Sequence, residues 1–285
     1  MRGKICLITG GTSGIGKAAA TELARQGATV VLAARSQGRG AQAARDISIA
    51  SGSKAVEVLV CDLASQASIR LFASDFLAKY ERLDVLLHSG AAVFSKRTQT
   101  EDAVESNFAV AYLSIFLIAS LLRERLVASA PARVVIVTGE YHRKTSLDFD
   151  NLMGEKRFSM IEAGSRAALA KTVFSAELAR QLEARGVTVN CLHPGAVRTA
   201  LLRNLPWYMR AAAYPVQYFF SSPEVGAKTP VYLASSPAVE GVTGKYFIDC
   251  KPVAPSAEVM DKSVGAKLWQ ASEALVQGSE PAIRS

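Results

Sequence analysis

Cysteine is scarce in this sequence, and its cysteines stand far apart. None of them belongs to a C-x-x-C pair or to a cluster with histidine. This spacing excludes a zinc ribbon and a disulfide-rich scaffold, and we predict no metal site. We expect a reduced, cytoplasmic protein, since no apolar stretch with a small-residue cleavage site precedes the first strand. The four cysteines are Cys6, Cys61, Cys191 and Cys250.

A basic run is also missing, although the formal net charge is +8. The lysines and arginines are scattered singly, without the interleaved aromatic residues of a nucleic-acid-binding surface. We therefore expect no nucleic-acid partner and interpret the charge as a basic surface around an anionic small ligand. Hydrophobic residues make up 49% of the chain, which excludes intrinsic disorder and allows a large core.

The sequence has no uncharged stretch that matches a bilayer crossing, which takes roughly 20 apolar residues. The stretch from Phe108 to Leu122 is closed by Glu105 on one side and by Arg123 on the other. A helix that is apolar on all sides and too short to span is usually buried in a core or in a subunit interface. We predict such burial, and we do not expect membrane contact.

Strand-like and helix-like segments alternate from residue 4 to about 195. Such alternation is typical of a parallel sheet with right-handed crossovers and with helices on both faces. We therefore predict an α/β fold in which residues 1–285 form a single doubly wound domain around a mostly parallel, seven-stranded sheet. The expected strands are Ile5–Thr9, Thr29–Ala34, Ala55–Val60, Val85–Leu87, Val134–Thr138, Val187–Leu192 and Gly244–Asp249, and the expected helices include Ser65–Tyr80, Ser165–Arg185 and Pro223–Ser235.

A glycine-rich turn joins the first expected strand to the first expected helix. Gly10, Gly14 and Gly16 would let the backbone approach a phosphate, and the helix N-terminus would offer free N–H groups to the anion. The second strand leads into Arg35, without the acidic residue that would hydrogen-bond the ribose of NAD. Arg35 suits a 2′-phosphate instead, which favours NADP(H). The alternative is an arginine that only faces solvent.

Two further segments have candidate roles in ligand binding. Asp62 follows the third expected strand, where its carboxylate either accepts a hydrogen bond from the adenine amino group or caps the next helix. An aromatic-rich segment at about residues 200–222 follows the last crossover, where open α/β sheets bind ligands. It is either a packed helix pair or an apolar lid over a hydrophobic substrate, and we favour the lid.

These motifs resemble those of the short-chain dehydrogenase/reductases. The resemblance rests on Thr9-Gly10-x-x-x-Gly14-x-Gly16, on Asp62-Leu63 and on His193-Pro194-Gly195-x-Val197-x-Thr199. The C-terminal segment Gly244 to Lys251 and the pair Leu268-Trp269 are similar to the retinol-dehydrogenase branch. The cofactor positions that it implies for NADP(H) are Gly10, Ser13, Gly14, Ile15, Gly16, Arg35, Asp62, Leu63, Gly90, Pro194, Gly195, Val197 and Thr199.

The branch also implies a substrate class and an assembly. Its members favour hydrophobic alcohols and aldehydes, so we expect a hydrophobic small-molecule substrate. The apolar helix after Asn107 and the helix through Ala167–Arg185 resemble the family's dimerisation helices. Both carry too much apolar surface for solvent, so we expect a homodimer or a homotetramer.

The same resemblance places small residues at all four catalytic positions of the family. Its members use a Tyr, a Lys four residues later, a Ser and usually an Asn to hold the substrate oxygen and move a proton. Gly164 and Ala168 stand at the Tyr and Lys positions. Gly139 stands at the Ser position and Ala111 at the Asn position. Either a ligand occupies the vacated space, or neighbouring side chains fill it after a loss of function.

Replacement acid–base groups are available near the vacated positions. Glu140 and Tyr141 directly follow Gly139, on the loop at the carboxyl end of the fifth expected strand. They combine a proton acceptor with a proton donor, and we nominate them as the catalytic pair. The alternative is that both are ordinary loop side chains.

Three functional hypotheses remain. The loss of a positioned general acid costs roughly 10²–10⁴ in rate, so we place first a non-redox enzyme, such as a cyclase, isomerase or dehydratase of secondary metabolism, with NADP(H) in a structural role. The second is hydride transfer between NADPH and a hydrophobic carbonyl or alcohol, with a new proton donor. The third is a non-catalytic protein that binds NADP(H) or a partner.

Overall fold

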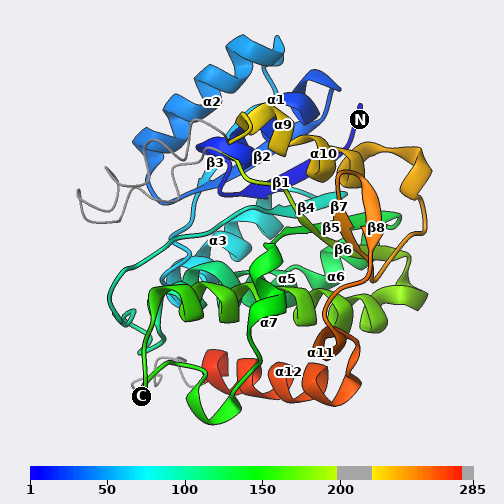
Figure 1. Cartoon of the computed structure of the whole chain (residues 1–285). Coiled ribbons are helices and arrows are strands. Elements are labelled where there is room, and N and C mark those ends of the chain that lie inside the picture. The colour runs from blue at the N-terminus through cyan, green and yellow to red at the C-terminus, as the bar shows by residue number, and fades with distance from the viewer. Residues whose placement is uncertain (198–219, 278–285) are drawn as a thin grey trace.

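The computed structural model describes residues 1–197 and 220–277, and its centre is one eight-stranded sheet (Figure 1). The strand order is β3-β2-β1-β4-β5-β6-β7-β8. The first seven strands are parallel, and β8 is antiparallel to β7. This confirms the predicted doubly wound α/β fold. The strands are β1 Ile5–Thr9, β2 Thr29–Ala34, β3 Val56–Val60, β4 Val85–His88, β5 Ala132–Val137, β6 Val187–His193, β7 Tyr246–Ile248 and β8 Lys251–Val253.

The edge strand β8 makes the sheet eight-stranded, where the sequence predicted seven strands. Asp249 and Cys250 join β7 to β8, and both have a positive φ, of 48° and 61°. In a two-residue hairpin turn of type I′, both central residues have a positive φ. The usual sequence signal for that turn is Asn-Gly or Asp-Gly, which this Asp-Cys pair does not provide.

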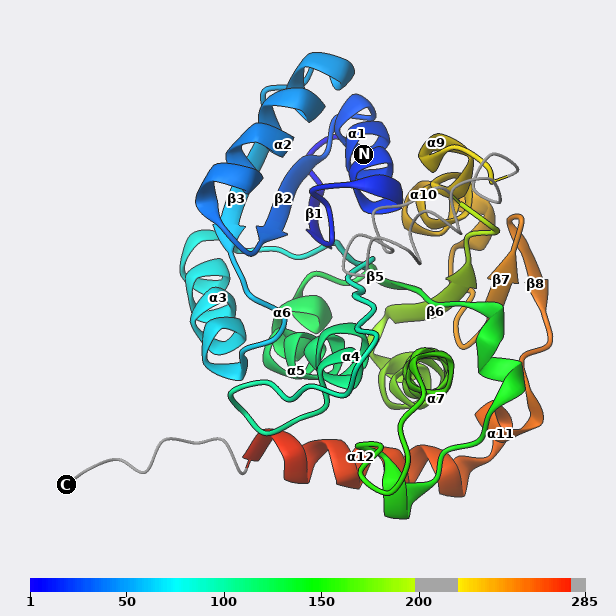
Figure 2. The same cartoon turned by 60° about the vertical axis from the view of Figure 1, so that its left-hand side comes forward.

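Helices cover both faces of the sheet, and each face has its own apolar core. Figure 2 shows α1, α2 and α10 on one face and α3, α5 and α7 on the other. In β1, Cys6 and Ile8 point into the first core and Leu7 into the second, because successive strand side chains face opposite sides. The helices are α1 Gly14–Arg25, α2 Gln37–Ser51, α3 Gln66–Lys79, α4 Ser106–Phe108, α5 Ser114–Leu121, α6 Arg123–Ala128, α7 Met160–Leu182, α9 Pro223–Gly226, α10 Lys228–Ser235, α11 Ala257–Met260 and α12 Lys262–Gln277.

The uncharged stretch from Phe108 to Leu122 is buried, as predicted, but it is not one regular helix. α4 passes into a π-helical segment, Ala109–Leu113, which continues as α5. Wide π-helical turns of this kind often occur at functional sites. Within the described residues, no helix combines the length and the apolar character that a membrane crossing requires.

The C-terminal helix α12 covers the apolar helices for which we expected a subunit partner. Trp269 packs against Phe116 and Phe174, with ring centroids 5.0 and 6.0 Å apart. The hydroxyls of Tyr112 and Ser272 are 2.6 Å apart, which fixes α12 against the π-helical segment. Much of the apolar surface that argued for a homodimer or homotetramer is therefore covered within the chain, and the oligomeric state stays a prediction.

Candidate functional site

The glycine-rich turn lies at the carboxyl end of β1 and leads directly into α1. Gly10 has a φ of 67°, and a Cβ at this position would lie 2.5 Å from the carbonyl oxygen of Ser89. A Cβ on Gly16 would lie 2.4 Å from the carbonyl oxygen of Gly10. The side chain of Ser13, the N-cap residue, makes no capping hydrogen bond, and the first turn of α1 has no acidic residue. The N-terminus of α1 is therefore free to bind an anion.

A second helix N-terminus lies beside Arg35, where β2 ends. Ser36 is the N-cap of α2, and its side chain makes no capping hydrogen bond. Arg35 and Arg39 are exposed, and neither takes part in an ion pair among the described residues. Two arginines and a free helix N-terminus suit a phosphate. Sequence reasoning missed Arg39, although its place in the first turn of α2 could have indicated it.

The turn after β3 brings three of the predicted cofactor residues close together. The carboxylate of Asp62 accepts a hydrogen bond from the backbone N–H of Ala64, and the cap of α3 is Ser65 rather than Asp62. The side chain of Leu63 lies against Gly90, where a Cβ would be 2.5 Å from Leu63 Cδ1. Because Ser65 caps α3, the second carboxylate oxygen of Asp62 is not used to cap that helix.

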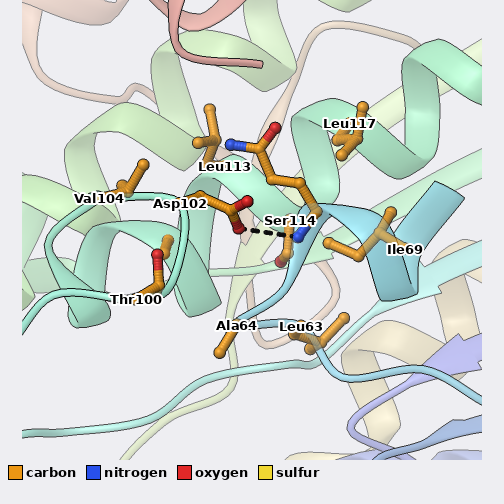
Figure 3. Close-up of a pocket in the computed structure, with 11 residues that line it drawn as sticks. Leu63, Ala64, Ile69, Thr100, Asp102, Val104, Leu113, Ser114 and Leu117 are labelled. Carbon is orange, nitrogen blue, oxygen red and sulfur yellow. Dashed lines mark hydrogen bonds between the residues drawn. The ribbon is translucent and has the colours of Figure 1, made fainter. Parts of the chain in front are cut away.

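A small cavity lies behind this turn, lined by Leu63, Ala64 and Asp102 among others (Figure 3). Its volume of about 10 Å³ is enough for about one water molecule and far too small for a substrate. In Figure 3 the dashed line marks the hydrogen bond from the backbone N–H of Gln66 to Asp102, which closes one side of this cavity.

The loop after β6 reaches the first turn of α1. Pro194 and Gly195 follow His193, and Val197 is the last residue described before the gap. Val197 and Ile15 both lie against Gly226 of α9, where a Cβ would be 2.6 Å from Val197 and 3.1 Å from Ile15. Thr199 lies outside the described residues, and so does the expected lid at about 200–222, apart from residues 220–222.

Two of the four positions that the resemblance assigns to catalytic residues, here called the vacated positions, have open space around them within the described structure. Among the described residues, a Cβ on Gly164 of α7 would meet no atom of another part of the chain within 4 Å. A Cβ on Gly139 would have Tyr141 Cδ2, at 3.8 Å, as its neighbour, which is an ordinary contact. At these two positions the described side chains leave space next to the backbone for a group the size of a methyl, which is the space that a larger side chain or part of a ligand would enter first.

The nominated pair, Glu140 and Tyr141, differs in its surroundings. Glu140 accepts a hydrogen bond of 2.7 Å from the Tyr246 hydroxyl and pairs with Arg143 at 3.4 Å. Burial by itself would raise the pKa of Glu140, but these two partners outweigh it and lower the pKa. Tyr141 is 58% exposed and has Lys144 over its ring. The Glu140 carboxylate is thus kept ionised and is hydrogen-bonded to Tyr246 of β7. The catalytic role of Glu140 and Tyr141 stays a prediction.

Two buried polar side chains that the sequence did not single out as a pair lie beneath the vacated positions. His88 ends β4: its Nδ1 accepts a hydrogen bond from the Thr9 hydroxyl at 2.8 Å, and its Nε2 faces the carbonyl oxygen of Ala111 at 3.2 Å. Lys171 on α7 donates to the carbonyl oxygen of Val137 at 2.8 Å. A lone lysine in the buried part of a helix was the signal that could have found it.

In the described ranges no group of three or more His, Cys, Asp or Glu side chains could hold a metal ion.

The chain is similar to known proteins over nearly its whole length. A family model described as short chain dehydrogenase matches residues 4–207. Human retinol dehydrogenase 14 is 41% identical over 292 residues, which cover 97% of this chain and 87% of that protein. Human dehydrogenase/reductase SDR family member 13 is 41% identical over 283 residues, which cover 96% of this chain and 74% of that protein.

Solved structures agree with this similarity. An uncharacterised protein from Mycobacterium paratuberculosis superposes with a TM-score of 0.78 at 28% identity, covering 97% of this chain and 94% of that one. RhlG from Pseudomonas aeruginosa, solved as an active-site complex with NADP, superposes with a TM-score of 0.68 at 25% identity. That match covers 87% of this chain and 94% of RhlG.

Proposed function

The chain belongs to the short-chain dehydrogenase family, and from that premise we propose that it is an NADP(H)-dependent oxidoreductase acting on a hydrophobic carbonyl or alcohol. The cofactor half of its site supports this proposal most directly. At Gly10 and Gly16 close backbone contacts leave no room for a side chain, so the turn between β1 and α1 stays tight, and the first turn of α1 has no acidic residue to compete with an anion. When bound, NADPH would supply the hydride.

The preference for NADP(H) over NAD(H) rests on charge at the end of β2. Arg35 and Arg39 flank the N-terminus of α2, whose first turn has no acidic residue. A 2′-phosphate there would gain charge-assisted hydrogen bonds from the arginines. The ribose of NAD would lack a hydrogen-bond acceptor, because position 35 holds an arginine instead of a carboxylate. The complex of RhlG with NADP supports the same cofactor for this chain.

The substrate class follows from the relatives. Retinol dehydrogenase 14 aligns with 97% of this chain, and its name specifies a hydrophobic alcohol. Because the four positions assigned to the catalytic residues hold Gly or Ala, the proton must come from another group.

A non-redox reaction is the second candidate function, and the open space at Gly139 and Gly164 favours it. A cyclase, isomerase or dehydratase could hold a reactive conformer of a hydrophobic molecule in that space. In that case NADP(H) would bind as a structural group and stay unchanged during turnover.

A calorimetric titration with NADPH and NADH tests the cofactor part of the proposal. We expect NADPH to bind more tightly, and Arg35→Ala to weaken NADPH binding by about 10–100-fold with little effect on NADH, since hydrogen bonds to charged groups are worth about 1.5–3 kcal/mol. Arg45→Ala, an exposed arginine further along α2, is the matched control. Equal affinities for the two nucleotides would contradict the assignment of Arg35.

Following NADPH absorbance with a panel of hydrophobic aldehydes then separates the two functions. Consumption of NADPH supports the oxidoreductase. Tight NADPH binding without consumption, together with a new product from the organic substrate alone, supports the non-redox enzyme.

A further inference from the structure

Lys171 is the most unusual buried group beside the vacated site. Its side chain is buried, and among the described residues no carboxylate lies within ion-pair distance of its ammonium group. Among the described residues its ammonium group donates to the carbonyl oxygen of Val137, which leaves two of its three N–H donors without a protein partner there. Burying a lysine without a counter-charge is unfavourable, so such residues are found mainly where a function needs them.

The position of Lys171 on α7 relates it to the vacated residues. Gly164 and Ala168 are four residues apart, and Lys171 follows Ala168 by three. Residues at these spacings lie on one face of a helix, one turn after another. On this face of α7, the resemblance assigns the Tyr and Lys of the family to positions 164 and 168. Lys171 is the next side chain along the same face.

The strands beneath this face bring the other vacated positions to the same place. Val137, which accepts the hydrogen bond from Lys171, ends β5 two residues before Gly139. His88 ends the neighbouring strand β4 and bonds the carbonyl oxygen of Ala111. The ammonium group of Lys171 thus bonds a residue two positions before Gly139, and its charge acts on His88, whose ring bonds Ala111.

The titratable groups around Lys171 leave its proton labile. Burial lowers the pKa of Lys171 to about 8. His88, on β4, is neutral, because burial and the charge of Lys171 lower its pKa to about 3. Cys191, on β6, stays a thiol, because burial raises its pKa to about 12. Lys171 is therefore the one group of these three that exchanges a proton near neutral pH.

We propose that Lys171 is the proton donor of this site and gives a proton to the oxygen of a hydrophobic carbonyl substrate; the proposal rests on the proposed function. In this step an N–H bond of the ammonium group breaks and an O–H bond forms on the substrate oxygen. When bound, NADPH would supply the hydride that reduces the carbonyl carbon. The neutral amine then regains its proton from solvent, and in alcohol oxidation every transfer runs in reverse.

A chemical test of access comes first, because it does not depend on turnover. The folded protein is reductively methylated with formaldehyde and cyanoborohydride, with and without NADPH, and each lysine is followed by peptide mass spectrometry. We expect Lys171 to react more slowly than the exposed Lys156, and NADPH to slow Lys171 at least about fivefold while leaving Lys156 unchanged. Modification of Lys171 only after denaturation would overturn the proposal, since a sealed amine cannot meet a substrate.

Substitution then tests the proton step. Lys171→Met should lower kcat/KM for NADPH oxidation by a long-chain aldehyde roughly 100-fold or more. It should not lower the Tm, because it removes an unpaired buried charge. Lys171→Arg keeps the charge but cannot release a proton at these pH values, so it should not restore activity. Lys156→Met is the matched surface control, and wild-type kcat/KM should fall as pH rises through about 8.

The outcomes separate this proposal from the function on which it rests. If Lys171→Met keeps wild-type turnover, Lys171 is not the donor, while the oxidoreductase function stands. If the wild-type protein consumes no NADPH with any carbonyl, the proposed function fails, and the proton step fails with it even where methylation shows access. If Lys171→Arg restores turnover, the residue supplies charge rather than a proton, and the proposal is wrong.

Discussion

Replacing glycine by alanine should have opposite effects on the free energy of unfolding at Gly164 and at Gly16. Both glycines lie inside helices, Gly164 in α7 and Gly16 in α1. Alanine in a helix interior is more favourable than glycine by about 1 kcal/mol. What differs between the two positions is the space that a methyl group would enter.

At Gly164 the new Cβ meets no other part of the described structure within 4 Å, so Gly164→Ala should keep the whole helical gain. We expect the free energy of unfolding to rise by about 1 kcal/mol, which corresponds to about 2 °C in Tm for a chain of this size. The N-terminus of α1 and Arg35 are untouched, so NADPH affinity should not change.

At Gly16 the new Cβ would lie 2.4 Å from the carbonyl oxygen of Gly10, which is backbone and cannot rotate away. Forcing such a contact costs about 1–3 kcal/mol, and more when the backbone must shift. After the helical gain of about 1 kcal/mol, Gly16→Ala should still lower the free energy of unfolding. Because the displaced carbonyl belongs to the turn that we propose binds the phosphates of the cofactor, NADPH affinity should fall as well.

Urea unfolding followed by circular dichroism gives both free energies, and calorimetry gives the two affinities. A loss of stability in Gly164→Ala would mean that the space beside Gly164 is filled, which would remove the main support for a ligand in the vacated site. A neutral Gly16→Ala would mean that the turn is looser than its close backbone contacts indicate.

Two further predictions concern the core and its pH dependence. Leu268→Ala in α12, where the side chain is 1% exposed, should lower the free energy of unfolding by about 2–5 kcal/mol in a urea titration; a change under 1 kcal/mol would mean that α12 is not part of the core. His88 has a folded pKa of about 3, below its unfolded value of about 6.5, so the unfolded chain binds the extra proton. Stability should therefore fall by about 1 kcal/mol per pH unit as the pH drops from about 6.5 toward 3. His88→Gln should flatten that part of the profile, and an unchanged slope would assign the acid sensitivity to other groups.

The parts of the fold that follow from local sequence pattern were predictable. The first six expected strands agree with β1 to β6 to within two residues at either end, since each is a short apolar run bounded by turn residues. The turn from Gly10 to Gly16 was predictable for a similar reason, because glycine spacing after a strand and before a helix is read within one stretch of chain. The cofactor half of the candidate site belongs to this class.

Tertiary structure decided the rest, because the decisive contacts join residues far apart in the chain. The Tyr246 hydroxyl on β7 donates a hydrogen bond to Glu140, which we nominated as the proton acceptor. The sequence of the loop after the fifth strand does not indicate that β7 would be its neighbour. α12 covers α5 and α7 through Trp269, which no pattern in the apolar stretch itself could indicate. Lys171 reaches Val137 at the end of β5 only because α7 packs against the neighbouring strand β6, and the lysine itself was one of many in the sequence. Periodicity shows which face of a segment is buried, but packing alone decides which distant side chain it is buried against.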